Sequence, residues 1–236
     1  KKYGELYISQ PTARATERTD NRNACCSSSV CDICPVDAKF TISNGLKYLY
    51  DIENIELQVG AEVRSLQTEG GSVKGVEYRI NGQDHVVKSN LVVLGANAIF
   101  NANILLNSGD PNPFVGKGLV EQFGLYGYFY LSDFDNVGGS SVITANGYML
   151  YDTKERSNHG ACLIESHNGP FIRGEVGKWR HIAKYKFIYE DIPDDKNGIF
   201  LNADNPYKPI VHFEGPSDYV LNAMKKLPEN VDAIFA

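Results

Sequence analysis

The sequence predicts an α+β fold, with a mixed sheet and helices in the first half and an antiparallel sheet in the second. In the first half, short β-like segments precede an apolar run that leads into a helical pattern, as in a βα unit. In the second half, tyrosine and phenylalanine recur at alternate positions, the period of a strand with one buried face. The 236 residues are 42% apolar and 22% charged, an ordinary globular composition.

Length and charge narrow the classes of protein. The chain has room for one or two domains. Its 23 basic and 29 acidic residues give a net charge of −6, which argues against a nucleic-acid-binding protein with its basic surface. The sequence contains no run of about 18 apolar residues, so it predicts no transmembrane helix. The start of the sequence, Lys1–Gly4, does not lead into the apolar region of a signal peptide.

The first elements lie in the first 90 residues. Residues 1–24 are polar and mostly irregular, and residues 38–50 predict a helix weakened by Asn44 and Gly45. Asn81-Gly82 is a strong hairpin signal, and it predicts that the segments on either side pair as antiparallel strands. The expected strands are residues 55–59, 62–67, 73–80 and 84–88.

The next element is an apolar run, Leu91–Leu94, which ends at Gly95 and predicts a strand buried on both faces, as in a parallel sheet. Residues 98–107 predict a helix because their apolar residues recur at helical spacing. A buried strand that turns on small residues into a helix allows the backbone to approach a nucleotide closely. The same pattern occurs in ordinary βα units, so the residues alone leave both interpretations open.

Prolines and glycines between residues 111 and 118 predict a domain boundary. Beyond it, residues 184–190 predict a strand with Tyr185, Phe187 and Tyr189 on one face. The remaining predicted elements are a turn at 193–198, strands at 199–202 and 210–214, and a helix at 219–226. The predicted domains are an irregular segment with a cysteine loop at 1–40, a mixed-sheet lobe at 41–115 and an antiparallel-sheet domain at 116–236.

Four of the five cysteines lie close together in one polar loop: Cys25, Cys26, Cys31 and Cys34. Cysteines of a disulfide framework are usually spread along the chain, so this clustering favours metal ligation. The serines of the loop and Asp32 leave the backbone pliable and rich in N–H groups, which stabilise thiolates and cluster sulfides. The fifth cysteine, Cys162, lies in an apolar context and is predicted to be a buried small hydrophobe.

Three interpretations of the loop remain open. Three or four thiolates can hold a three-iron or a four-iron cluster. A structural zinc usually takes two separated pairs of ligands, and the second pair is missing here. The third interpretation is free thiols or disulfides, including a redox pair of Cys31 and Cys34 in a Cys-x-x-Cys motif.

Several nucleotide-binding and hydrolase motifs are absent from the sequence. It contains no complete Gly-x-Gly-x-x-Gly fingerprint, no phosphate-binding P-loop and no Gly-x-Ser-x-Gly nucleophile turn. The five histidines are scattered, and His167 and His181 are the candidates for a polar site. No residue of the chain is assigned a catalytic role.

Two strings resemble the signatures of the glucose–methanol–choline (GMC) oxidoreductases. Residues 91–109 are similar to the family's second signature, an apolar strand and Ala-Gly-Ala followed by Leu-Leu and Ser-Gly, with Asn97 in place of the glycine. Residues 115–122 are similar to its Val-Gly-x-Asn-Leu-x-x-His segment, with Gly118 for the asparagine and Gln122 for the histidine.

Two shorter strings extend the resemblance. Residues 34–40 resemble the segment before the cofactor-covering helix in the sugar and polyol dehydrogenase branch, and residues 190–198 resemble a hairpin of the family's substrate domain. The resemblance implies that residues 41–115 form part of an FAD-binding lobe and that residues 116–236 form a substrate-side domain.

The spacing Cys25-Cys26-x4-Cys31 is similar to the cluster loop of FAD-dependent, membrane-associated dehydrogenases of this family. That resemblance implies a [3Fe–4S] cluster held by Cys25, Cys26 and Cys31. Cys34 is then either a nearby non-ligand or the fourth ligand of a [4Fe–4S] cluster.

The resemblance also implies where FAD is bound. Val63 would offer its backbone to the adenine, and Ala96 would approach the flavin, within the turn that also holds Gly95, Asn97 and Ala98. The family's Gly-rich fingerprint is expected before the first residue and its catalytic histidine after the last. The chain is therefore expected to be an internal fragment that does not turn over substrate alone.

The implied function is that of a catalytic subunit that oxidises a sugar or alcohol hydroxyl. Electrons would pass from the flavin through the iron–sulfur cluster to a multihaem cytochrome c, and a small chaperone-like subunit is also expected. The implied location is the periplasmic side of a bacterial inner membrane, with membrane association only through partners. The alternatives are a non-catalytic electron-transfer or zinc-stabilised binding module, and a GMC alcohol oxidase that uses oxygen.

Overall fold

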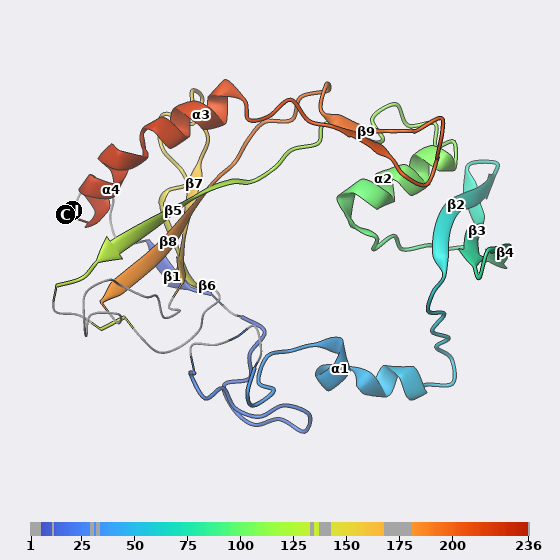
Figure 1. Cartoon of the computed structure of the whole chain (residues 1–236), viewed down its shortest axis with the longest axis horizontal. Helices are drawn as coiled ribbons and strands as arrows, with labels where there is room; N and C mark the ends of the chain where they lie inside the picture. The colour runs from blue at the N-terminus through green and yellow to red at the C-terminus, as the bar shows by residue number, and fades with distance from the viewer. Residues whose placement is uncertain are drawn as a thin grey trace. The chain divides into compact units, whose positions relative to one another are not determined.

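The computed structural model describes residues 6–10, 12–28, 31, 34–132, 135–136, 143–167 and 181–235. It confirms an α+β fold with few helices, but not the mixed sheet predicted for the first half, because the pairing is antiparallel in all three sheets of the described part (Figure 1). The chain groups into two compact units. The first unit combines Lys1–Ile55, Gln122–Asp191 and Pro216–Ala236, and the second combines Glu56–Glu121 and Ile192–Gly215.

The first unit is built on a five-stranded antiparallel sheet. The order of its strands is β1 (Tyr7–Ser9), β6 (Ile143–Leu150), β7 (Cys162–His167), β8 (Ile182–Tyr189) and β5 (Phe123–Tyr130). As predicted, Tyr185, Phe187 and Tyr189 of β8 share one face, and Phe187 and Tyr189 are almost fully buried. The opposite face of the edge strand β5 is accessible to solvent, as shown by Tyr126 and Tyr128, which are about half exposed.

Two C-terminal helices cover the apolar face of this sheet (Figure 1). Helix α3 (Asp218–Lys225) was predicted, and Ser217 caps its start by accepting the N–H of Val220. Helix α4 (Leu227–Phe235) was not predicted, because Pro228 and Asn230 weaken its helical pattern. Val220 is fully buried among the strand residues, so the helices close the main hydrophobic core of the unit.

Strand β1 corrects the expectation that the first 24 residues are irregular. It pairs with β6, and Tyr7 lies opposite Gly147. A Cβ atom at Gly147 would lie 2.9 Å from Cδ2 of Tyr7, so the missing side chain makes room for the tyrosine ring. Local sequence does not reveal such a strand, because its partner is far along the chain.

The predicted helix at residues 38–50 is also corrected. It is divided into α1 (Ile42–Gly45) and the 3₁₀ helix η1 (Lys47–Asp51). Thr41 and Asn44 form a reciprocal capping box that starts α1 at residue 42. The low helix propensity of Asn44 and Gly45 accounts for the break.

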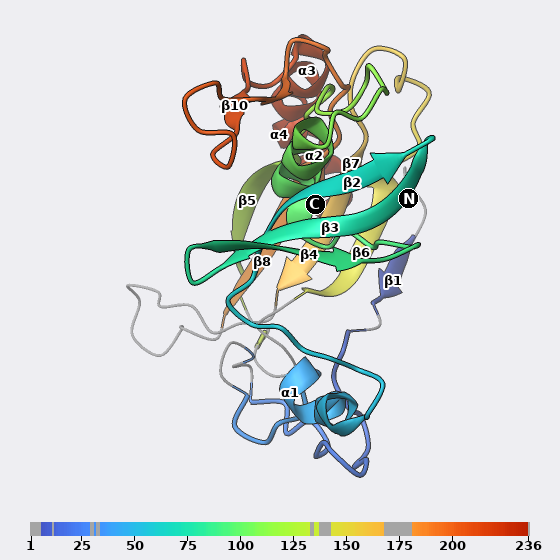
Figure 2. The ribbon, with the colours of Figure 1, turned by 90° about the vertical axis from the view of Figure 1, so that its right-hand side faces the viewer.

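The second unit contains the predicted hairpin, now a three-stranded sheet of β2 (Glu62–Glu69), β3 (Ser72–Ile80) and β4 (Gln83–Lys88). Figure 2 shows the three strands side by side. Asn81 and Gly82 have φ values of 51° and 79°. Both values are positive, as a type I′ turn requires, so the hairpin prediction is confirmed.

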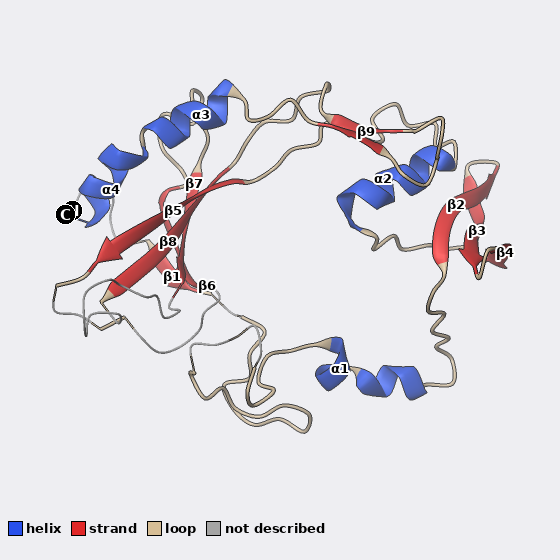
Figure 3. Cartoon of the chain, in the orientation of Figure 1, coloured by secondary structure: helices blue, strands red, loops and turns tan. Residues whose placement is uncertain are grey.

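Two predicted strands are wrong. Residues 55–59 contain no strand: a turn at residues 53–54 precedes them, and a turn at residues 59–60 ends them. Residues 91–94 form a loop between β4 and α2 (Figure 3), with Leu91 79% and Val93 87% exposed. An apolar run becomes a strand only where a neighbour completes its hydrogen-bond ladder, and no described strand pairs with this one.

Helix α2 (Asn97–Asn107) confirms the predicted helix and packs on β2, where the N–H of Leu66 donates to Oγ of Ser108 at 2.7 Å. A second, two-stranded sheet pairs β9 (Gly198–Phe200) with β10 (Ile210–His212). Within the described residues, no helix is long and apolar enough to cross a membrane.

Candidate functional site

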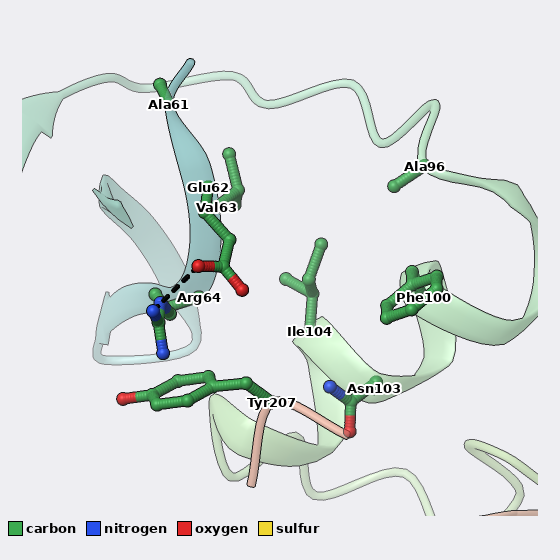
Figure 4. A pocket seen from close by; sticks show the side chains of 9 residues that line it. All are labelled: Ala61, Glu62, Val63, Arg64, Ala96, Phe100, Asn103, Ile104 and Tyr207. Carbon is green, nitrogen blue, oxygen red and sulfur yellow. Dashed lines mark hydrogen bonds and ion pairs between the residues drawn. The ribbon is translucent and has the colours of Figure 1, made fainter. Parts of the chain in front are cut away.

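A pocket of the second unit lies between β2 and α2. Its volume is about 290 Å³. Figure 4 shows the nine side chains around it. They come from three segments: Ala61, Glu62, Val63 and Arg64 at the start of β2, Ala96, Phe100, Asn103 and Ile104 from α2 and the turn before it, and Tyr207 from the loop between β9 and β10.

The pocket brings together two residues that the family resemblance links to FAD. Val63 and Ala96 lie 33 positions apart in the sequence and line the same pocket. Gly95, Asn97 and Ala98 adjoin Ala96 at the start of α2 but are not among the lining residues. A pocket of this volume holds one ring system of a dinucleotide rather than both of its ends.

The turn before α2 is fastened by two asparagines. Asn101 accepts the N–H of Ala96 at 2.8 Å and donates to the carbonyl of Leu94 at 3.3 Å. Oδ1 of Asn97 accepts the N–H groups of Ile99 and Phe100, which otherwise have no partner in the first helical turn. These bonds fix the position of Ala96 against the pocket.

Asn97 adopts a left-handed backbone conformation with a φ of 78°. Glycine is the residue best suited to this region, and asparagine is the side-chain-bearing residue that tolerates it best. At Asn97 the chain has asparagine where the Ala-Gly-Ala pattern has glycine. Both residues can adopt the left-handed backbone conformation found at this position. Gly118, which stands for an asparagine in the other string, has a φ of 72°.

Arg64 was not predicted as a site residue, although it forms the floor of the pocket. Its guanidinium carbon lies 3.3 Å from the centre of the Tyr207 ring, and Nη2 lies 2.7 Å from Oε2 of Glu62. Its Nε and Nη1 are buried without a hydrogen-bond partner in the described part, so the aromatic face is their main compensation. The only sequence signal was the i, i+2 spacing of Glu62 and Arg64, which places both on one face of a strand.

Two amides of α2 hold the loop that carries Tyr207. The carbonyl oxygen of Pro206 accepts hydrogen bonds from Nδ2 of Asn103 at 3.1 Å and from Nδ2 of Asn107 at 2.9 Å. Both donors lie on the helix that forms the opposite wall of the pocket. The tyrosine is thereby tied to α2 through its neighbour, and it in turn covers Arg64.

The cysteine loop has a defined backbone but no assembled metal centre. Backbone hydrogen bonds join Cys25 to Ala15 and Ala15 to Ala38, and the N–H of Ala38 donates to Sγ of Cys34 at 3.2 Å. Backbone N–H groups, with that of Lys39 the strongest contributor, lower the pKa of the Cys34 thiol. All five cysteines lie in the described part, and none of them forms a disulfide there.

The four thiols do not fit a cluster site in this arrangement. Among the described residues, which include Cys25, Cys26, Cys31 and Cys34, no three histidine, cysteine or acidic side chains are placed to hold a metal ion. Cys26 is exposed, whereas Cys31 is buried. The remaining cysteine, Cys162, is buried as predicted, with an exposed fraction of 2%.

The two candidate histidines lie in the first unit. His181 precedes β8, and its Nε2 lies 3.0 Å from Oδ1 of Asp135. His167 ends β7, and its ring forms a T-shaped pair with that of Tyr126 at a centroid distance of 6.4 Å. Neither lines the pocket of the second unit.

Comparison with known proteins adds no assignment. No family model matches the chain, and no curated protein matches it.

Proposed function

We propose that this chain is part of the catalytic subunit of an FAD-dependent dehydrogenase that oxidises a hydroxyl group of a sugar or an alcohol. The observation that carries the proposal is the placement of Val63 and Ala96 on one pocket. In this proposal, the pocket holds the adenine end of FAD against the main chain of Val63, and Ala96 forms a wall of that end instead of the flavin contact that the resemblance implies. When bound, FAD supplies a hydride acceptor for the carbon that bears the hydroxyl group.

Backbone geometry gives independent support to the resemblance. The chain departs from the two GMC strings at Asn97 and Gly118, and both positions have a left-handed φ. An exchange of asparagine and glycine at such a position preserves the turn. The substitutions at Asn97 and Gly118 are therefore compatible with the backbone turns of the two GMC segments. An exchange of asparagine and glycine at a negative φ would not support the resemblance in this way.

Binding of FAD by the purified chain tests this proposal. Ala96→Phe places a large ring against the pocket, and Ala98→Phe is the matched control because Ala98 is exposed and does not line it. We expect wild type and Ala98→Phe to bind FAD equally, with at least a tenfold weaker affinity for Ala96→Phe, measured by the quenching of flavin fluorescence. Equal binding by all three proteins, or no binding by wild type, contradicts the proposal.

For the cysteine loop, we propose an iron–sulfur cluster that involves Cys25, Cys26 and Cys31, with three irons favoured over four. Metal sites commonly assemble only with the metal, and the loop must rearrange to bring these thiols together. A haem protein as electron acceptor, a small chaperone-like subunit and a periplasmic location belong to the same proposal and follow from the resemblance alone.

The cluster is tested on aerobically purified protein by EPR spectroscopy, with iron and acid-labile sulfide measured on the same sample. An oxidised three-iron cluster is paramagnetic, whereas an oxidised four-iron cluster and zinc give no signal. We expect a signal that Cys25→Ser abolishes and that Cys162→Ser, at a buried cysteine outside the loop, leaves intact. Protein without iron but with one equivalent of zinc favours the alternative of a zinc-stabilised binding module.

A further inference from the structure

The carboxylate of Glu62 is held at the edge of the pocket. Its Oε2 lies 2.7 Å from Nη2 of Arg64, and Oε1 accepts no hydrogen bond from the described residues. Figure 4 shows this carboxylate between β2 and α2, on the side of Ile104. One oxygen is therefore fixed by an ion pair, and the other remains available to a ligand.

The carboxylate of Glu62 is held by Arg64, whose own side chain is fixed by further contacts. A pair of exposed side chains contributes little and holds no fixed geometry. Arg64, however, has a side chain that is only 10% exposed, and it is stacked on Tyr207. The carbonyl oxygen of Pro206, the residue before Tyr207, accepts hydrogen bonds from two side-chain amides of α2. The position of Glu62 is thus set by contacts that reach across the pocket to its other wall.

The rest of the pocket is suited to a flat, apolar ring. Val63, Phe100 and Ile104 supply aliphatic and aromatic surface, and Ala96 leaves room beside them. Flat heterocycles bind in such slots through their faces and are identified by polar groups at their edges. A carboxylate at the edge is only a hydrogen-bond acceptor, so it selects a ring that presents a donor there.

We propose that Glu62 recognises the exocyclic amino group of adenine in this pocket, with Oε1 as the acceptor and Arg64 as the positioning residue. This inference rests on the proposed function, because FAD supplies the adenine. It adds a side chain to a contact that the resemblance assigned to the main chain of Val63. It also specifies the base: hypoxanthine carries an oxygen in place of the amino group and would face the carboxylate with a second acceptor.

Titration calorimetry of the full chain with AMP and with IMP tests this assignment. We expect AMP to bind about tenfold more tightly than IMP, the effect of one hydrogen bond to a charged acceptor. In Glu62→Gln, the amide can donate to the oxygen of IMP, and the preference should fall to about twofold or less. Glu69→Gln is the matched control, because Glu69 is exposed on the same strand and lies outside the pocket.

The outcomes separate this assignment from the proposed function. Equal affinities of wild type for AMP and IMP, or an unchanged preference in Glu62→Gln, overturn the role of Glu62 while FAD binding and its loss in Ala96→Phe remain valid. Absence of both FAD and AMP binding in wild type overturns the two together. Glu62 has a 59% exposed side chain, so its replacement by glutamine should preserve the fold, and an unchanged circular dichroism spectrum confirms this.

Discussion

The guanidinium group of Arg64 lies over the ring of Tyr207, with its central carbon 3.3 Å from the ring centre. The pair joins the edge of the three-stranded sheet to a loop that follows β9. Because the tyrosine is tied to α2 through Pro206, the stack determines how far apart the two walls of the pocket stand. The ligand-binding properties of the pocket therefore depend on a contact outside its apolar surface.

Replacement of Tyr207 should separate the contribution of the ring from that of its hydroxyl group. Tyr207→Phe retains an aromatic face over Arg64 and should change the free energy of unfolding by less than about 0.5 kcal/mol. Tyr207→Leu loses the cation–π contact and should destabilise the second unit by about 1–2 kcal/mol. Urea unfolding followed by circular dichroism measures both, and equal effects of the two substitutions would argue against the contact.

Asn97 should tolerate glycine better than alanine. Asn97→Gly keeps the left-handed φ at no steric cost and loses the two hydrogen bonds that Oδ1 accepts from Ile99 and Phe100, so the expected loss of stability is a few tenths of a kcal/mol. Asn97→Ala loses the same bonds and must also adopt a φ of 78°, with an expected loss of about 1–2 kcal/mol. Thermal unfolding of the two variants gives the order, and a more stable alanine variant would contradict it.

Two neighbouring glycines should respond differently to substitution. A Cβ atom at Gly116 would lie 2.4 Å from the carbonyl oxygen of Ile199, so Gly116→Ala should cost more than about 2 kcal/mol. Gly118 also has a positive φ, but a Cβ atom added there would lie 3.3 Å from its nearest neighbour, Cβ of Pro193. Gly118→Asn should therefore cost less than about 1 kcal/mol. Chemical denaturation of both variants measures the two losses. The larger loss at Gly116 would reflect the clash of the new Cβ atom with Ile199, whereas the loss at Gly118 would reflect the positive φ.

Glu155 should contribute to acid unfolding of the first unit. Lys226 and His159 donate to its carboxylate at 2.5 and 2.8 Å, and the lysine bond is the larger cause of a pKa lowered to about 2. A depressed folded pKa stabilises the protein above the ordinary value of 4.5, and this contribution disappears as the pH falls from 4.5 through 2.

Glu155→Gln should therefore flatten the fall in stability between about pH 5 and pH 2, while the exposed Glu69→Gln should not. Urea midpoints at several pH values within this range provide the measurement. Parallel pH curves for Glu155→Gln and wild type would show that the ion pair contributes nothing to folding.

The thiols should differ in their reactivity. Burial raises the pKa of Cys162 to about 12, and its side chain is inaccessible. In metal-free protein, Cys162 should therefore remain unmodified by a disulfide reagent at pH 8 until the protein is unfolded, whereas the exposed Cys26 reacts in the native state. Mass spectrometry of the labelled peptides identifies each site. Native labelling of Cys162 at the rate of Cys26 would refute its burial.

Elements with a strong local signal were predictable from the sequence. The Asn81-Gly82 turn has the positive φ values that define its hairpin, and the alternation of Tyr185, Phe187 and Tyr189 identified the buried face of β8. In both cases the information lies within a few residues. Helix α2 was also predicted, and its observed bounds, Asn97–Asn107, agree closely with the predicted residues 98–107.

Elements that depend on distant partners were not predictable. Strand β1 exists because β6 lies beside it, and the apolar run at 91–94 forms no strand because no described strand pairs with it. The same applies to the pocket. Val63 and Ala96 were identified through the resemblance, but Tyr207 lies in an irregular loop whose sequence has no period, so its contact with Arg64 emerged only from the fold.

The tether from α2 to Pro206 has a consequence for synthesis on the ribosome. The hairpin of β2, β3 and β4 is local and can form soon after it emerges, but the partner of Asn103 is translated 103 residues later. At about 5–20 residues per second, this interval lasts about 5–20 s. During it, the side-chain amide of Asn103 lacks the carbonyl of Pro206, so the pocket is completed only after the loop that carries Tyr207 has been synthesised.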